Sequence, residues 1–195
     1  MLRIVLIRPG TTDYDDQERI QGALDIPLNE KGRAEAGQIA EQLKDQGIEL
    51  MYTAVCASAQ QTAETIAERL DVKLRKLDRM QNVDHGLWQG LPISEVRHKQ
   101  PKAYRQWQEQ PENVCPPEGE MLNQAEDRVR STMTRLLKRH KEGVIALVAP
   151  EPLATLVRHF VTQEELGDLW KSLGSHSQWE VLEVQAVKVP LVTSG

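Results

Sequence analysis

The chain has 195 residues, of which 39% are hydrophobic and 27% are charged, as in an ordinary globular protein. We expect one domain over residues 1–195, long enough to bury a full core. The net charge of −5 gives no basic field, which argues against a nucleic-acid partner. No apolar window reaches the ~20 residues of a membrane span, and the N-terminus shows no secretion signal. We therefore expect a cytoplasmic protein without a membrane partner.

The first element is a strand. Residues 2–7 form a nearly continuous apolar run, which is typical of a parallel strand that is covered on both faces. Arg8, Pro9 and Gly10 follow and predict a turn that presents a guanidinium and backbone N–H groups. In open α/β sheets ligands bind at this carboxyl end of a strand. Residues 12–27 show no sustained periodicity and predict a long loop, which is uncommon unless it is functional.

Helical and strand patterns then alternate along the first half of the chain. In order, we expect a helix capped by Asn29 and stopped by Gly47, a strand over residues 50–57, a helix capped by Ser58 that runs to about Leu70, and a strand over residues 72–77.

The second half continues the alternation after an irregular stretch over residues 81–91. We expect one or two short helices over 93–110 broken at Pro101, a rigid loop over 111–119, a long helix over 120–141 ended by Gly143, a strand over 144–149, a helix opened by Pro150 and Pro152 that runs to about Val161, and closing antiparallel strands over 178–184 and 187–192. This pattern predicts an α/β fold, a three-layer α/β/α sandwich around a mainly parallel central sheet.

Six motifs run through the chain in a fixed order. They are Arg8-Pro9-Gly10-Thr11-Thr12, the block 19–32, the segment 57–65, the block 82–91, Pro117-Glu118-Gly119-Glu120, and Val148-Ala149-Pro150-Glu151. Together they resemble the signature blocks of the histidine phosphatase (phosphoglycerate mutase-like) superfamily, whose first motif is Arg-His-Gly-x-Thr. The resemblance implies a phosphoglycerate mutase-like domain with a cap insertion at roughly residues 80–120.

The chain departs from this family at its catalytic positions. In the family one histidine attacks phosphorus, an arginine and a second histidine help to hold the phosphoryl oxygens, and a glutamate acts as general acid. The resemblance places Pro9, Gln61, Asn82 and Pro150 at these four positions. Proline offers no side-chain nucleophile and asparagine does not titrate. We therefore expect no catalytic residues, and a pseudoenzyme with a ligand-sensing or protein-interaction role.

The resemblance also implies a ligand site without the catalytic residues. Its residues are Arg8, Gly10, Thr12, Asp15, Gln21, Gly22 and Glu151. We expect a small anionic ligand or a protein partner there, with no cofactor and no metal. Because phosphate binding is expected to be weak, a carboxylate of the protein should pair with Arg8; we favour Glu151, near a helix start, over Asp15.

Two alternatives to ligand sensing stay open. One is an enzyme that acts on a phosphomonoester without a phosphohistidine, by a metal-assisted route through Asp13, Asp15, Asp16 and Asp84. The other is an interaction subunit whose cleft is filled. Metal-dependent turnover would favour the former, and a closed cleft the latter. For His85 we expect a packing role in place of an aromatic residue.

Overall fold

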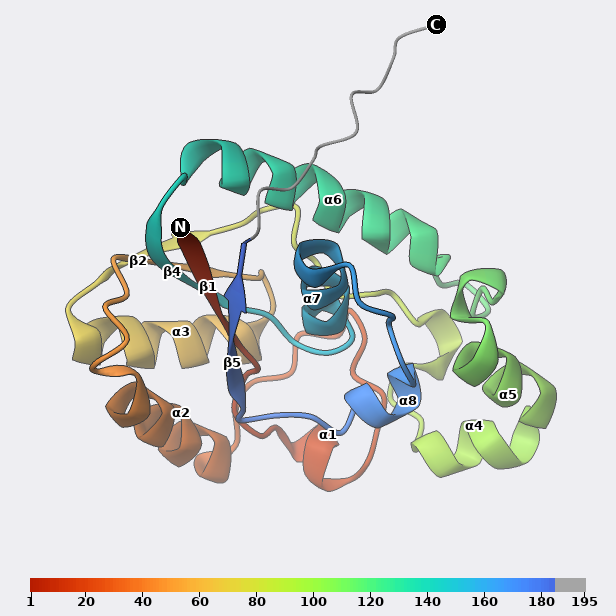
Figure 1. Cartoon of the computed structure of the whole chain (residues 1–195). Coiled ribbons are helices and arrows are strands. Elements are labelled where there is room, and N and C mark those ends of the chain that lie inside the picture. Colours follow the sequence, from red (N-terminus) through yellow and green to blue (C-terminus); the bar gives the residue numbers. More distant parts are fainter. Residues whose placement is uncertain (185–195) are drawn as a thin grey trace, which may run out of the picture.

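The computed structural model of the protein describes residues 1–184 and contains a five-stranded sheet with helices on both faces (Figure 1). The strands are β1 (Leu2–Ile7), β2 (Leu50–Thr53), β3 (Lys73–Lys76), β4 (Gly143–Val148) and β5 (Trp179–Glu183). Their order in the sheet is β3-β2-β4-β1-β5.

The sheet is parallel except at one edge. β1 pairs with β4 in parallel, from Leu2 opposite Gly143 to Ile7 opposite Val148. β2 is parallel to both β3 and β4, whereas β5 runs antiparallel to β1. The predicted mainly parallel sheet with an antiparallel closing strand is therefore confirmed. The strand predicted over 187–192 lies outside the described residues.

The helices form the two outer layers. They are α1 (Asp13–Asp16), α2 (Glu30–Leu43), α3 (Ala57–Leu70), α4 (Ile93–Lys99), α5 (Pro101–Glu109), α6 (Leu122–Arg139), α7 (Leu153–Thr162) and α8 (Leu169–Ser172), with the 3-10 turns η1 (Gly86–Trp88) and η2 (Pro111–Asn113). α2 packs against α3 on one side of the sheet, and α6 packs against α7 on the other (Figure 1). The predicted three-layer arrangement is therefore confirmed.

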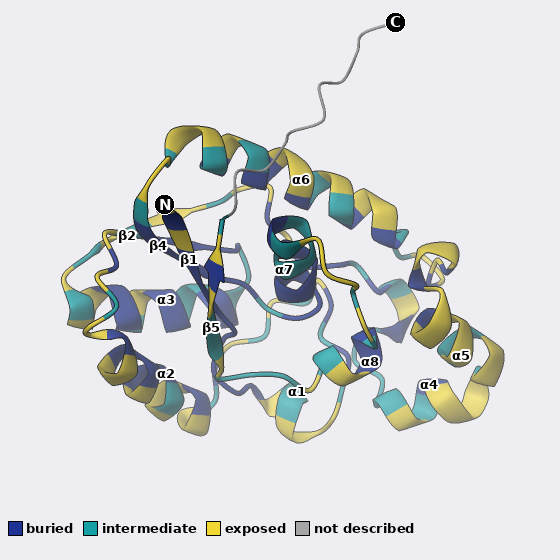
Figure 2. Cartoon of the chain, viewed as in Figure 1, coloured by how far each residue is buried: buried dark blue, intermediate teal, exposed yellow. Residues whose placement is uncertain are grey.

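The apolar core lies between these layers, and β1 runs through its centre. Ile4, Val5, Leu6 and Ile7 are all fully buried, as their unbroken apolar run predicts. Figure 2 shows the inward faces of α2, α3 and α7 buried as well. β3 lies at the edge of the sheet far from β5. It carries exposed Lys and Arg side chains, which discourage pairing with another chain.

The predicted loop over residues 12–27 contains the short helix α1. The Thr12 side chain accepts a hydrogen bond from the Asp15 backbone N–H, and the Asp15 carboxylate accepts one from the Thr12 N–H. This reciprocal cap stabilises a single helical turn, which is too short to produce a helical periodicity in the sequence.

Three predicted boundaries were wrong. β2 ends at Thr53 rather than continuing to residue 57. Cys56 occupies the cap position of α3, so Ser58 lies inside the first turn of that helix. α2 ends at Leu43, four residues before the positive-φ turn at Gly47. The predicted cap at Asn29 is confirmed, because its side chain accepts from the Gly32 N–H at 2.9 Å.

Residues 80–120 lie beside the sheet rather than within it, and contain η1, α4, α5 and η2. The predicted break at Pro101 separates α4 from α5. Within residues 1–184, none of the helices combines the length and the apolar character that a bilayer crossing requires.

Candidate functional site

A small cavity lies at the carboxyl ends of β1 and β4. The loops that follow the two strands contribute Pro9 and Pro150, and the first turn of α3 contributes Ser58. Its volume is about 30 Å³, which is room for about two water molecules. The cavity therefore opens at the sheet edge where α/β proteins bind ligands.

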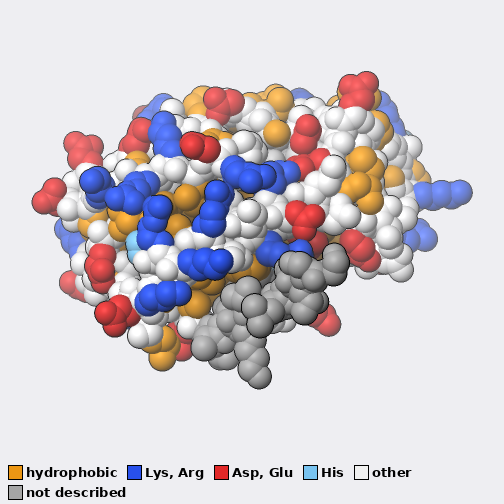
Figure 3. Space-filling model, turned by 90° about the horizontal axis from the view of Figure 1, so that it is seen from above, with side chains coloured by type: hydrophobic (Ala, Val, Ile, Leu, Met, Phe, Trp, Pro, Cys, Tyr) orange, Lys and Arg blue, Asp and Glu red, His pale blue; other side chains and the backbone are white. Residues whose placement is uncertain are grey.

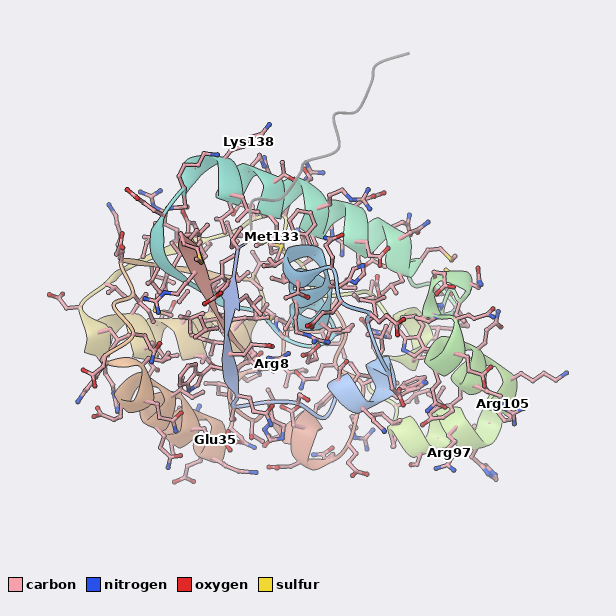
Figure 4. All side chains as sticks on the ribbon, viewed as in Figure 1. Arg8, Glu35, Arg97, Arg105, Met133 and Lys138 are labelled. Carbon is pink, nitrogen blue, oxygen red and sulfur yellow. The ribbon has the colours of Figure 1, made fainter. Side chains whose placement is uncertain are left out.

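Arg8 lies beside this cavity and is held by two carboxylates. Its Nε donates to Glu151 Oε1 at 2.7 Å, and its Nη1 donates to Glu180 Oε1 at 2.8 Å. Figure 4 shows Arg8 in the middle of the molecule, among the side chains around β5 and α7. The predicted pair with Glu151 is confirmed. Glu180 was not predicted, because β5 reaches Arg8 only through its antiparallel return.

These pairs keep Arg8 charged although it is largely buried. Its side chain is 10% exposed and that of Glu151 only 3%. Burial alone would lower the pKa of Arg8, but the charge of Glu151 and the hydrogen bonds from Glu180 and Glu151 outweigh it and raise that pKa. The other oxygen of Glu151 accepts from the Thr155 N–H at 3.2 Å in the first turn of α7. Both Glu151 oxygens therefore have partners within the protein.

Asp15, the other predicted partner of Arg8, organises its own loop instead. Its Oδ2 accepts from the Thr12 N–H at 2.7 Å and from the Thr12 hydroxyl at 2.8 Å. Its Oδ1 accepts from Gln21 Nε2 at 2.8 Å. All three residues line the cavity, so these bonds fix the shape of its outer wall.

Asn82 closes the cavity from the cap side. Its Nδ2 donates to the carbonyl oxygens of Gly22 at 3.0 Å and Glu151 at 2.9 Å. Because both partners are acceptors, the orientation of the amide is fixed. Asn82 is 5% exposed, and its Oδ1 is buried without a hydrogen-bond partner among the described residues.

The structure brings most of the predicted ligand residues to the cavity, but not all. Gly10, Thr12, Asp15, Gln21 and Glu151 line it, whereas Arg8 and Gly22 lie just outside. Gly10 also approaches α2 so closely that a Cβ atom there would lie 2.3 Å from the Gly32 carbonyl oxygen. A side chain at position 10 therefore requires the backbone to move.

Gln61, which was expected in the cavity, is not brought there. Its side-chain oxygen accepts from the Leu28 N–H at 2.8 Å. Ser58, one turn earlier on α3, is the side chain of this helix that lines the cavity. Neither residue supplies a positive charge.

Sequence reasoning missed Arg19, Ser175 and His176, which also line the cavity. The Arg19 guanidinium donates to the Gly90 carbonyl and to Gln17. Arg19 begins the family-like block 19–32, and this position could have indicated that Arg19 belongs to the site. Ser175 and His176 lie in a segment without periodicity, and nothing in the sequence marked them.

His176 belongs to a hydrogen-bond network between the loop after β1 and the segment before β5. The Thr11 hydroxyl lies 2.7 Å from Glu35 Oε2 and 3.1 Å from His176 Nδ1. The same Glu35 oxygen accepts from the Thr11 N–H at 2.9 Å and from the Ser177 hydroxyl. Figure 4 shows Glu35 near the end of α2, close to the start of β5.

His85 packs in the cap, as expected. It is fully buried, and its ring meets Trp107 edge-on with 5.3 Å between ring centroids. Its Nδ1 lies 3.1 Å from the Val83 carbonyl oxygen, so Nδ1 is the protonated nitrogen. Burial lowers the pKa of His85 to about 4, and the ring is therefore neutral at pH 7.

Three of the four acidic residues considered for a metal ion bind separate partners. Asp15 binds Thr12 and Gln21, as described above. Asp16 accepts from Asn29 Nδ2 at 2.9 Å, and Asp84 accepts from the Gly86 N–H at 2.8 Å. Across the described part of the chain, no three His, Cys, Asp or Glu side chains are grouped as a metal ion would require.

Comparison with known proteins gives a consistent result. The sequence model of the histidine phosphatase superfamily (branch 1) matches residues 4–193. The chain is 31% identical over 149 residues to phosphoserine phosphatase 1 of Hydrogenobacter thermophilus, covering 76% of this chain and 71% of that protein. It is 36% identical to phosphoglycerate mutase-like protein 4 of Arabidopsis thaliana, covering 74% and 64%.

One solved structure is similar to this chain in both fold and sequence. It is mycobacterial glucosyl-3-phosphoglycerate phosphatase in complex with VO3, which superposes with a TM-score of 0.82 at 28% identity and covers 93% of this chain and 92% of that one.

Proposed function

Since the chain belongs to the histidine phosphatase superfamily, we propose that it is a member without phosphohistidine chemistry that acts by binding a ligand or a protein partner. The relatives are named as phosphatases and mutases, and their chemistry needs a nucleophile and a positively charged phosphate site. The cavity of this chain contains Pro9 and Pro150 at its two strand ends.

The observation that carries the proposal is the pairing of Arg8 with Glu151 and Glu180. Stabilising a transferring phosphoryl group requires positive charge directed at its oxygens. Here two carboxylates accept from two of the five N–H donors of one guanidinium, and the group formed by these three side chains is net negative. A phosphate that approached Arg8 would therefore meet two carboxylates that are already paired with it.

The remaining cavity favours ligand binding over a filled cleft. A volume of about 30 Å³ persists between Pro9, Pro150 and His176, and both polar and apolar side chains line it. The proposal is therefore a binding protein built on a phosphatase scaffold, and its cavity is the binding site.

The test is a turnover assay on the purified chain. Phosphoserine, 3-phosphoglycerate and p-nitrophenyl phosphate are each supplied with and without Mg²⁺ or Mn²⁺, and phosphoserine phosphatase 1 of Hydrogenobacter thermophilus serves as the positive control. We expect no phosphate release above the buffer rate. Turnover near ~1 s⁻¹, within the usual enzyme range, would overturn the proposal, and dependence on the metal would indicate the metal-assisted alternative.

A further inference from the structure

We propose that His176 is the ligand-recognition residue of the cavity: Thr11 and Glu35 fix its tautomer, and its Nε2 accepts a hydrogen bond from a hydroxyl or ammonium group of a small ligand. The inference rests on the proposed function, because it names the kind of ligand that the non-catalytic cavity takes. Such a site prefers a neutral or cationic ligand, whereas a phosphate site prefers an anion.

The tautomer follows from counting protons at Thr11. A threonine hydroxyl has one proton to donate, and the Glu35 carboxylate 2.7 Å away can only accept it. The Thr11 oxygen must therefore act as the acceptor toward His176 Nδ1 at 3.1 Å. His176 then carries its proton on Nδ1, and in the neutral ring Nε2 keeps a lone pair.

Glu35 is suited to orient this chain of hydrogen bonds. One of its oxygens accepts from the Thr11 N–H, the Thr11 hydroxyl and the Ser177 hydroxyl. Burial acts to raise the pKa of Glu35, but these hydrogen bonds and the proximity of His176 outweigh it and lower that pKa. The carboxylate is therefore ionised at pH 7, and it cannot supply a proton to Thr11.

His176 lines the cavity, and no hydrogen bond of its Nε2 is found within residues 1–184. A lone pair at the cavity wall is an acceptor, and it selects ligands that donate. Because His176 is held from its Nδ1 side, Nε2 is the ring nitrogen that is left for a ligand.

The other groups around the cavity have the same preference. Asp15 lines the cavity, and Glu151 and Glu180 hold Arg8 beside it, so three negative charges stand against the two positive charges of Arg8 and Arg19. The donors of Arg19 already reach Gly90 and Gln17. Asn82 also lines the cavity, and its Oδ1 is a buried acceptor without a donor among the described residues. A donor-bearing ligand that is neutral or cationic therefore fits this site, and an anion does not.

The first experiment reads the tautomer by NMR. Long-range ¹H–¹⁵N correlation spectra of the full chain are recorded at about pH 8.5, above the usual titration range of imidazole. We expect the Nδ1–H form of His176 in the native protein and in Thr11→Ser, which keeps the hydroxyl. In Thr11→Val, of nearly the same shape, we expect the Nε2–H form to become populated. Ser177→Ala removes a donor to Glu35 but not to His176, and should leave the tautomer unchanged.

The second experiment measures binding of ethanolamine, which carries both an ammonium and a hydroxyl group, with inorganic phosphate as the anionic probe. For so few non-hydrogen atoms we expect a Kd in the millimolar range, read from the His176 resonances. Thr11→Val should weaken binding about five-fold, the value of one hydrogen bond, and Thr11→Ser should restore it. Ser175→Leu should block the cavity, whereas Ser131→Leu on the outer face of α6 should not.

Three results would overturn the inference. They are tighter binding of phosphate than of ethanolamine, no saturable effect of ethanolamine on His176, or a Thr11→Val tautomer identical to that of the native protein. Each is independent of the turnover assay: phosphatase activity would refute the proposed function, whereas these results would refute only the role of His176.

Discussion

Arg8 is a buried cation whose charge is matched by two carboxylates, and its removal leaves a charge without a partner. The Glu151 side chain is only 3% exposed in the native protein, and Arg8→Ala removes its cation. We expect the free energy of unfolding to fall by about 3–5 kcal/mol at pH 7, the cost of breaking a buried pair from one side. Equilibrium unfolding in urea measures this change.

The matched control for this prediction is an exposed pair. Lys99 Nζ lies 2.7 Å from Glu95 on α4, and its side chain is 68% exposed. Lys99→Ala should therefore cost about 0.5 kcal/mol or less. If the two variants lose equal stability, water reaches Arg8 freely and the pair beside the cavity contributes little.

His85 makes stability depend on pH in a defined window. Its pKa in the folded protein is about 4, because burial disfavours the charged ring; Asp84 and Glu120 oppose this effect only partly. In the unfolded chain the value is about 6.5. Below pH 6.5 the unfolded state therefore binds more protons, and stability falls as pH drops toward 4, by up to ~3 kcal/mol.

His85→Phe tests this directly, since phenylalanine keeps an aromatic ring against Trp107. The unfolding free energy of the native protein minus that of the variant should be constant above pH 6.5 and decrease between pH 6.5 and 4. Urea titrations at several pH values give this difference. A difference that stays flat would mean that His85 is solvated or already charged.

Two glycines of α2 have opposite environments. A Cβ atom at Gly32 would lie 2.1 Å from the Thr11 carbonyl oxygen, whereas one at Gly37 would meet only the end of the Arg69 side chain at 2.9 Å. The Thr11 backbone cannot move away from a new Cβ atom as easily as the end of the Arg69 side chain can. Gly32→Ala should lower the unfolding free energy by about 1–3 kcal/mol or more.

Gly37→Ala should stay within about 1 kcal/mol of the native protein, because the gain in helix propensity offsets the displacement of Arg69. Unfolding titrations of both variants measure the contrast. Because Thr11 also holds His176, Gly32→Ala should shift the His176 resonances as well, and Gly37→Ala should not. Equal stability losses would show that α2 and the loop after β1 adjust together.

At the scale of elements, the sequence correctly predicted those features that a long apolar run or a proline marks. The run over residues 2–7 and the break at Pro101 both appear where they were expected. The helices α1 and α8 have four residues each, too few for a period of 3.6 to be visible. The start of α3 was misplaced because Cys56, with no side-chain hydrogen bond at the cap, carries no capping signal.

The residues of the site also divide into those that the sequence predicted and those that it did not. Arg8 and Glu151 were paired in advance, because the family resemblance placed the Glu151 turn across the cleft from Arg8 and the helix start there favours a negative charge. Glu180 and His176 come from the chain returning antiparallel after α8, and no local pattern encodes that approach. Ser58 lines the cavity about one helical turn before the expected Gln61, an offset that the sequence motif alone does not fix.

Across the whole molecule, charge is distributed unevenly. Figure 3 views the side on which α6 lies, and Lys and Arg side chains gather across much of that face. Burial lowers the pKa of His140, and the charges of Arg139 at the end of α6 and Arg75 on β3 lower it further. The net charge of −5 conceals this basic face.

We expect the protein to be retained on a sulfonate cation exchanger at pH 7.5 and low salt, although its net charge is negative. The double variant Arg75→Glu and Arg139→Glu should elute at lower salt than Lys102→Glu and Arg105→Glu, a matched pair on α5. Figure 4 shows Arg105 at the far end of the molecule from Lys138. Equal elution of the two variants would mean that retention follows net charge alone.

The position of β1 has a consequence for how the chain acquires its fold. β1 lies between β4 and β5 in the described sheet, so it is synthesised well before both neighbours, which begin at residues 143 and 179. At ~5–20 residues per second, its apolar run waits on the order of ten seconds for a neighbour. We therefore expect β1 to be the segment of the nascent chain that most needs protection from aggregation, and the cavity to form only after β4 and β5 have joined the sheet.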